Sequence, residues 1–503
     1  MSTIRKQSII SSAITYAGFA IGMLNTYFMT SEKYAFSEEQ YGLTQIFINI
    51  TGLMMSLAVL AMPSFIFKFF HYYKDNLPPK KNDMLTWALL MGVVGFLLTM
   101  VAGYVLKDVV ARKFTENSAL LVTYYYWLFP MAFGLSIYSI LEAYTWGLGK
   151  SVVAVFLREV QWRVFVSILI ALVAMEVITD FSVFIKLYSL TYLGLAAFLF
   201  IYLLAEGHIH FTFKVSKVSR RFGSKILRLC TYFYAATIMF SLAQVFDVIV
   251  IAAVLKDGAA LAGVFTLAQL MTSIIQAPQR AVVAASVTYL SKAWKEKDYG
   301  LLKRVYQRSS INLLIFASGI FALIALNYKE AILTFQLKEA YLAGFGAFIL
   351  LGATRVIDLG TGVNAQIIAT STYWKFELVC GIILLLFMLP LSYFLAVGYG
   401  LIGPAIANLV SITIYNAIRI LFLWKKFRLF PFTMQSLYAV FLAGACFTAC
   451  YFAFNAIHGF AGLVVRSAVF LALFGTGVIY FRLTPDLLPV WQTVQKRMGI
   501  RKP

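Results

Sequence analysis

The sequence predicts an all-α polytopic membrane protein with about fourteen transmembrane helices. Three observations predict this fold class: the composition, the length of the apolar segments and the short connections between them. Of the 503 residues, 61% are hydrophobic and only 13% are charged. A soluble globular protein carries about 25% charged residues, so this chain has too few polar side chains to cover a soluble fold of its size. The same composition excludes a disordered chain.

Each predicted span is a continuous apolar window. A helix that crosses the hydrocarbon core needs about 20 mostly apolar residues. The windows are continuous rather than alternating, which excludes a β-barrel. The two longest windows, 262–290 and 341–368, are expected to extend beyond the hydrocarbon. The fourteen windows are residues 9–29, 43–67, 84–106, 120–142, 153–175, 183–205, 229–253, 262–290, 309–327, 341–368, 376–397, 400–424, 433–455 and 462–481.

The distribution of lysine and arginine predicts the orientation, because cytoplasmic connections are rich in both residues. The chain has 42 lysine and arginine residues against 21 aspartate and glutamate residues, a formal net charge of +21. With the N-terminus inside, 29 basic residues fall in or near inner connections and 9 in outer ones. Both termini are therefore predicted to be cytoplasmic. Binding to nucleic acid is the alternative interpretation of this charge, and it is disfavoured because the charges lie between apolar spans.

No soluble domain, cofactor or metal site is predicted. The outer connections are too short for a folded domain, and no Walker A motif is present, so this chain is not expected to hydrolyse ATP. His208 and His210 form an HxH pair without a third ligand. Disulfides and a zinc site are not expected, because all 4 cysteines lie in apolar stretches: Cys230, Cys380, Cys446 and Cys450.

An internal repeat divides most of the chain into two halves. The basic connection 206–228 separates the first twelve spans into six and six, so both halves have the same topology. Gly42 and Lys74 of span two are 32 residues apart, as are Gly263 and Lys295 of span eight. The expected organisation is an N-lobe at 1–205, a basic cytoplasmic linker at 206–228, a C-lobe at 229–424, and spans thirteen and fourteen with a basic cytoplasmic tail at 425–503.

Small and polar residues recur at helical spacing along four spans. Close packing through small residues explains span one taken alone, whereas four stripes on corresponding helices favour a shared polar cavity. Asn25, Gln45, Asn49, Gln269 and Gln276 are candidate substrate-binding residues in that cavity. The stripes are Ser8, Ser11, Thr15, Gly18, Gly22 and Asn25; Gln45, Asn49, Gly52 and Ser56; Tyr234, Thr237, Ser241 and Gln244; and Gln269, Ser273, Gln276 and Arg280.

Ionisable side chains inside spans are functional candidates, because each costs about 2.5–3.5 kcal/mol at the centre of a helix on insertion scales. Arg280, beside Pro278, has no carboxylate one turn away on its own helix. It requires a carboxylate from another helix or, as we favour, a substrate phosphate. Arg355 and Asp358 can pair on one helical face. Two interpretations of this pair stand side by side, a structural pair that neutralises itself and a functional site. Arg355 is a further substrate-binding candidate, and Asp247 and Asp358 are candidates for coupling to an ion gradient.

The remaining charged residues near span ends are interpreted as structural. Glu159 and Arg163 are one turn apart and are expected to pair near the inner interface. Arg419 lies near the inner end of span twelve, where its side chain can reach the interface. Glu142 lies at the end of a span.

Three segments together carry a family resemblance. The motif FSEEQYG at Phe36–Gly42 looks like an eeyG start of span two. The hairpin from Phe246 to Asp298 has an Asp after the polar face of span seven and a Pro that interrupts span eight. The motif GYGLIGPAIAN at Gly398–Asn408 looks like a yGi.GaAia turn between spans eleven and twelve. In order and spacing, these segments resemble the Wzx-type flippases of the polysaccharide transporter family. That family belongs to the MOP superfamily, which also includes lipid II flippases and multidrug (MATE) antiporters.

The resemblance implies two six-helix lobes around a central cleft that opens alternately to each side, with the extra pair of spans guiding a lipid tail. It implies a flippase, not an enzyme, that carries a polyprenyl-pyrophosphate-linked oligosaccharide across the bacterial inner membrane for surface polysaccharide or lipopolysaccharide synthesis. A proton or sodium ion is expected to couple transport. Membrane lipids and other polysaccharide-assembly membrane proteins are expected partners, and no cofactor is expected.

Two branches of the superfamily remain as alternatives. Lipid II flippases are typically cationic in span one, and MATE antiporters often carry an Asp there, whereas span one of this chain has no charge. Arg280 and Arg355 also disfavour an antiporter for cationic drugs. A membrane polysaccharide polymerase or ligase would need a large outer loop with polar catalytic residues, which this chain lacks.

Overall fold

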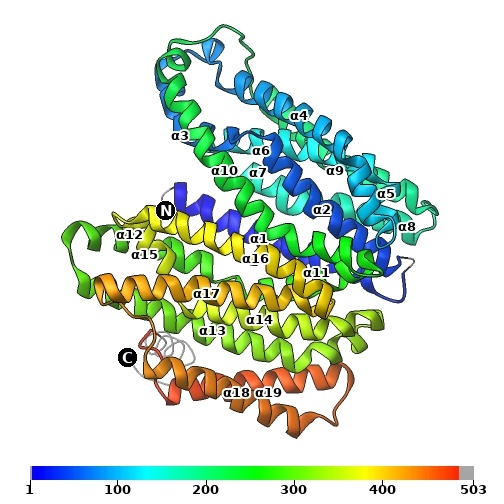
Figure 1. Ribbon diagram of the computed structural model, residues 1–503, viewed down its shortest axis with the longest axis vertical. Coiled ribbons are helices and arrows are strands. Elements are labelled where there is room, and N and C mark those ends of the chain that lie inside the picture. The colour runs from blue at the N-terminus through cyan, green and yellow to red at the C-terminus, as the bar shows by residue number, and fades with distance from the viewer. Residues whose placement is uncertain (1–2, 35, 487–503) are drawn as a thin grey trace. The chain divides into compact units, whose positions relative to one another are not determined.

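The computed structural model describes residues 3–34 and 36–486, and this part of the chain is helical, without a β-strand (Figure 1). Eleven of its helices are long and apolar enough to cross a membrane, so the all-α polytopic fold class is confirmed. The other three predicted windows, 9–29, 120–142 and 153–175, coincide with helical segments that are not among these eleven. The count of fourteen spans therefore stays a prediction.

The chain separates into two compact units, Met1–Gly263 and Val264–Pro503. In the first unit α6 is the central helix and packs against α2, α3, α4 and α9. Aromatic side chains from α3 and α6 fill its core. The helices of this unit are α1 (Thr3–Thr30), α2 (Glu38–Ala58), α3 (Met62–Asn76), η1 (Pro79–Lys81), α4 (Met84–Phe114), α5 (Ala119–Thr123), η2 (Tyr125–Trp127), α6 (Leu128–Gly147), α7 (Ser151–Phe156), the π-helical turn η3 (Leu157–Gln161), α8 (Trp162–Ala174), α9 (Phe181–Ala205) and α10 (Lys217–Val254).

In the second unit the 36-residue helix α13 is central and packs against α12, α14, α18 and α19. The C-terminal pair α18 and α19 lies along α13 (Figure 1), where the absent side chain of Gly319 leaves room for Phe474. The helices are α11 (Gly258–Gln276), which begins in the first unit, α12 (Gln279–Glu296), α13 (Tyr299–Thr334), η4 (Glu339–Ala343), α14 (Gly344–Gly360), α15 (Asn364–Thr370), α16 (Trp374–Tyr399), α17 (Ile402–Phe427), α18 (Met434–Phe454) and α19 (Gly459–Tyr480).

Helix α10 packs within the first unit, although it follows the 206–228 connection. The Tyr234 hydroxyl donates to the carbonyl oxygen of Leu57 at 3.1 Å, and the hydroxyl oxygens of Ser56 and Ser241 are 2.5 Å apart. These contacts join the polar stripes predicted on spans two and seven. The boundary between units therefore falls after α10, and the division into transport lobes at 206–228 stays a prediction.

The motif FSEEQYG forms the start of α2 as a capping box. The Ser37 hydroxyl accepts from the Gln40 N–H at 3.1 Å, and the Gln40 side chain accepts from the Ser37 N–H at 2.9 Å. A Cβ on Gly42 would overlap the carbonyl oxygen of Ala259, and a Cβ on Gly263 would lie 3.0 Å from the Cα of Gly42. The two glycines that the sequence repeat equates therefore lie against each other, and their missing side chains permit the contact.

Candidate functional site

Three windows that the sequence predicted as single spans are each two helices with a break between them. Between α2 and α3, Leu60 and Ala61 adopt left-handed backbone angles, with φ of 46° and 57°, which few residues other than glycine do. Between α11 and α12 stands Pro278, which has no N–H to donate. Between α14 and α15, Gly362 has a φ of 65°. The windows 262–290 and 341–368 are long because each contains such a break.

The breaks in spans two and eight lie at corresponding positions of the repeat. Aligning Gly42 with Gly263 brings the two breaks within one helical turn of each other. Interrupted helices at matching positions of two halves are the feature that marks substrate sites in transporter folds. The reason is that each half-helix ends in N–H or C=O groups without intrahelical partners, which are available to a ligand.

The break in span eight carries three polar residues within five positions. The Gln276 side chain at the end of α11 donates to the Gln279 side-chain oxygen at the start of α12, at 2.9 Å. Arg280 is the second residue of α12, and its side chain lies outside the described part of the structure. Gln269 is half-buried two turns earlier on α11. Arg280 belongs to the first turn of α12, where the positive end of the helix dipole favours an anion.

Gln45 and Asn49 lie one turn apart on α2 and are both half-buried. The Gln45 side chain donates to the Thr44 hydroxyl at 3.3 Å, and the Asn49 side chain donates to the Gln45 carbonyl oxygen at 2.8 Å. These bonds are local to α2, so the second amide proton and the amide oxygens of both residues can serve a ligand.

Asn25 takes part in a contact between helices instead. Its side-chain nitrogen donates to the Arg163 carbonyl oxygen at 2.8 Å, and its oxygen accepts from the Ser167 hydroxyl at 2.6 Å. A Cβ on Gly22 would lie 2.7 Å from the Arg163 Nε, and one on Gly18 would overlap the Glu159 backbone. From Gly18 to Asn25, the polar stripe of α1 thus packs against η3 and α8. This agrees with the interpretation that small residues on span one permit close helix packing.

Four charged side chains form a chain of ion pairs in the first unit. Arg158 on η3 lies 3.0 Å from Glu142 of α6 and 3.3 Å from Glu159, and Arg163 lies 2.7 Å from Glu159. The predicted Glu159–Arg163 pair is therefore present. Glu142 is more than a residue at a span end, since it is buried and paired with Arg158. The π-turn, a local feature frequent at functional sites, brings Arg158 to this carboxylate.

A polar network surrounds the break in span ten. The Asn416 side chain on α17 donates to Asp358 at 2.9 Å and accepts from the Thr361 hydroxyl at 3.1 Å and from the Asn364 side chain at 2.9 Å. Thr361, Asn364 and Asn416 are buried. Through Asn416, Asp358 is thus joined to a network with three other oxygen-bearing side chains from two spans. Arg355 lies one turn before it on α14 and is half-buried.

An ion pair between a buried arginine and a half-buried glutamate lies one turn further along α17. Arg419 binds Glu377 of α16 through two nitrogens, with Nε 3.0 Å from Oε2. The guanidinium carbon of Arg419 lies 3.7 Å from the centre of the Tyr415 ring, and the Tyr415 hydroxyl donates to Glu377 at 3.1 Å. Arg419 is only 5% exposed. The expectation that Arg419 reaches the membrane interface is wrong, because Glu377 on the neighbouring span neutralises it inside the protein.

Asp247 is buried near the end of α10, in the first unit. The four cysteines are buried and free. Within residues 3–34 and 36–486, no group of three or more His, Cys, Asp or Glu side chains is placed to hold a metal ion. Sequence reasoning missed Glu142, Glu377 and Asn416 as partners of charged residues, because each partner lies on a different span and no helical spacing relates them.

Solved structures with the same fold come from flippases and transporters. The chain aligns with a structure described as lipid II flippase MurJ in an inward closed conformation, with a TM-score of 0.75 and 14% identity, over 95% of this chain and 100% of that one. It aligns with an inward-facing multidrug resistance MATE transporter of the MOP superfamily at a TM-score of 0.60 and 16% identity, over 83% of this chain and 99% of that one. A third match is a MOP superfamily transporter from Pyrococcus furiosus, described as having a binding pocket of reversed polarity. Its TM-score is 0.52 with 16% identity, over 88% of this chain and 96% of that one.

No protein-family model and no curated protein sequence matches the chain. The fold therefore defines the class: a multi-pass membrane protein with the architecture of MOP-superfamily flippases and transporters. At these identities the likeness concerns the fold, and the structures that share it are transporters and flippases rather than enzymes.

Proposed function

We propose that this protein is a flippase that moves a polyprenyl-pyrophosphate-linked oligosaccharide from the cytoplasmic to the outer leaflet by alternating access. One observation carries the choice of substrate class. The lipid II flippase fold matches 95% of the chain, whereas the multidrug transporter fold matches 83%. A lipid II flippase and a MATE-like antiporter remain the alternatives, and the uncharged span one favours neither.

The proposed substrate needs polar partners at every stage of the crossing. A buried hydroxyl without a hydrogen bond costs about 2–7 kcal/mol, depending on the reference state, so an oligosaccharide cannot cross hydrocarbon unaided. Gln45 and Asn49 on α2 and Gln269 and Gln276 on α11 are amides, which both donate and accept and so suit sugar hydroxyls. Asn25 is kept as a weaker candidate for substrate binding, because its side chain is bonded to α8.

Arg280 is proposed to bind the pyrophosphate. A guanidinium matches two phosphate oxygens at once, and its place at the start of α12 adds the helix dipole. Arg355 is proposed as a second substrate-binding cation. The alternative is that Arg355 balances Asp358 one turn away.

Asp358 and Asp247 are proposed to couple transport to a proton or sodium gradient. The network around Asp358 supports this role, because the carboxylate and the side-chain oxygens of Thr361, Asn364 and Asn416 gather at a broken helix, where a small cation finds oxygen ligands.

The pair α18 and α19 is proposed to guide the lipid tail. Polar contacts fix this pair to α13: Glu330 lies 3.1 Å from Arg466 and accepts from the Gly459 N–H at 2.5 Å, and Asn327 donates to Ser467 at 3.2 Å. The proposed location is the bacterial inner membrane with both termini cytoplasmic, where other polysaccharide-assembly membrane proteins would supply the substrate and use it.

Native mass spectrometry of protein purified from its own membranes tests the proposal. The expected finding is a bound polyprenyl-pyrophosphate glycan that is lost in Arg280→Ala and kept in Lys292→Ala, a matched change at an exposed site on the same helix. Surface polysaccharide should also be lost in Arg280→Ala at unchanged protein abundance. Bound organic cations and no glycan lipid would instead support the antiporter, and wild-type export by Arg280→Ala would remove Arg280 from the site.

A further inference from the structure

The connection between α9 and α10 has an amphipathic pattern that the proposed transport function does not use. Residues 209–215 read IHFTFKV, in which apolar and polar residues alternate. The segment has no helical structure, and in an extended chain successive side chains point to opposite sides. One side therefore carries the apolar residues and the other carries the polar and basic ones: Ile209, Phe211, Phe213 and Val215 against His210, Thr212 and Lys214.

Three hydrogen bonds hold this connection against the first unit. The Tyr144 hydroxyl of α6 donates to the His208 carbonyl oxygen at 3.2 Å. The N–H of Thr212 donates to the Thr86 hydroxyl of α4 at 3.1 Å. The N–H of Ser216 donates to the Asp83 carboxylate at 2.8 Å. The position of the segment over the ends of α4 and α6 is thereby fixed along its whole length.

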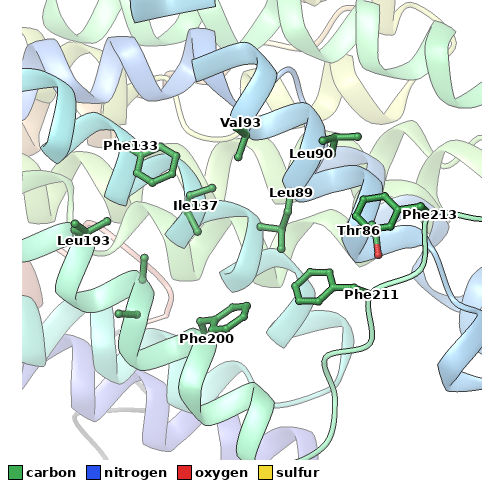
Figure 2. Close-up of a pocket in the computed structure, with 12 residues that line it drawn as sticks. Thr86, Leu89, Leu90, Val93, Phe133, Ile137, Leu193, Phe200, Phe211 and Phe213 are labelled. Atoms are coloured by element: carbon green, nitrogen blue, oxygen red, sulfur yellow. The ribbon is translucent and has the colours of Figure 1, made fainter. Parts of the chain in front are cut away.

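A crevice of about 430 Å³ lies beneath the segment, between α4, α6 and α9 (Figure 2). Phe211 and Phe213 extend toward it from the connection, and Leu89 and Phe133 line it from α4 and α6. The rings of Phe211 and Phe200 stack with centroids 6.3 Å apart. Thr86 is the one lining residue with a polar side chain, and its hydroxyl is bonded to Thr212. The crevice thus suits a hydrocarbon chain, and its volume lies in the usual range for ligand pockets, about 300–1,000 Å³.

The apolar side chains at the mouth of the crevice are not covered by the protein. Phe211 is 53% exposed and Phe213 is 72% exposed. The helices beneath them, α4 and α9, are candidate membrane spans, and the two rings lie beside the ends of these spans, a position at which an interface favours aromatic residues. The polar side of the same segment carries His210 and Lys214, and α10 continues with further basic residues, so this edge attracts negatively charged lipid headgroups.

We infer that this crevice binds one acyl chain of an anionic phospholipid, with Phe211 and Phe213 covering the chain and Lys214 meeting the headgroup phosphate. The site lies wholly within the first unit, on α4, α6, α9 and their neighbouring connection. It is separate from the polar residues of the proposed substrate pathway. A lipid bound there would fasten the connection that leads into α10.

Native mass spectrometry of the detergent-solubilised full chain tests the inference. The probe is an equal mixture of dioleoyl phosphatidylglycerol and dioleoyl phosphatidylcholine, which share their chains and differ in headgroup charge. The wild type is expected to retain phosphatidylglycerol about tenfold more than phosphatidylcholine. Equal retention of the two lipids would overturn the assignment to an anionic lipid.

Two variants fill the crevice from opposite walls. Ala197→Phe adds a ring at an exposed position of α9, and Leu90→Trp does so from α4; both positions line the crevice. Each is expected to lower retained phosphatidylglycerol about tenfold. Ile201→Phe, exposed on α9 but outside the lining, is the control and should bind as the wild type. Wild-type binding by both filling variants would overturn the location.

A variant of Lys214 tests recognition of the headgroup charge separately from binding of the acyl chain. Lys214→Gln is expected to abolish the preference for phosphatidylglycerol while binding of one lipid chain persists, and Lys292→Gln, an exposed change in the second unit, should keep the preference. Full preference in Lys214→Gln would overturn the assignment of the phosphate contact. Since none of these measurements uses the transported substrate, they succeed or fail independently of the proposed function.

Discussion

The ion pair between Glu377 and Arg419 provides a test of how this fold accommodates charged side chains between its helices. Arg419 is 5% exposed, and its guanidinium is bound by the carboxylate of Glu377 and covered by the Tyr415 ring. Three variants probe the pair: Glu377→Leu, Arg419→Leu and the double variant. Leucine replaces each charged side chain with an apolar one.

The two single variants should be far more damaging than the double variant. Removing one partner of a buried ion pair leaves an uncompensated charge and costs about 3–5 kcal/mol, whereas replacing both partners with apolar residues is near neutral or stabilising. Glu377→Leu leaves Arg419 with the Tyr415 hydroxyl and ring as neighbours, and neither carries a negative charge. We therefore expect each single variant to lose about 3–5 kcal/mol of stability and the double variant to recover most of it.

The measurement is the midpoint of heat-induced loss of the monodisperse peak in size-exclusion chromatography, for all variants in one detergent. Glu206→Leu is the matched control, since Glu206 pairs with Lys150 in a partly exposed connection, where such a pair contributes about 0–1 kcal/mol. A double variant whose midpoint falls by the sum of the two single losses would refute the reasoning. So would a single variant with the midpoint of the wild type.

Two further predictions follow from close contacts. Gly42→Ala should lower the same midpoint, because its Cβ would overlap the Ala259 carbonyl oxygen. Gly52→Ala on the same helix meets nothing within 4 Å and should raise the midpoint, because alanine is about 1 kcal/mol more favourable than glycine in a helix. Equal midpoints for the two variants would contradict this. Asn416→Leu removes the shared partner of Asp358 and should cost about 1–3 kcal/mol. Thr413→Ala at an exposed site of α17 should change little, and a loss as large as that of Asn416→Leu would argue against the network.

The sequence alone determined the class of protein and the position of most helices. An apolar run long enough to span the hydrocarbon has few alternatives, because charged residues are costly there. Local spacing also predicted the Glu159–Arg163 pair, since residues four apart share a helical face. The repeat spacing from Gly42 and Gly263 identified two glycines that meet in the structure.

Only the tertiary structure decided where spans break and which charges meet. Glu377 forms an ion pair with Arg419, Glu142 forms one with Arg158, and Asp358 accepts a hydrogen bond from Asn416. In each case the two partners lie on different spans. It also placed α10 with the first unit. Periodicity along a helix shows which face a residue occupies, but it does not show which neighbouring helix that face meets. The neighbouring helix is set by packing between segments far apart in the chain. The partner of a buried charge is therefore the oppositely charged or polar side chain that this packing brings into contact with it.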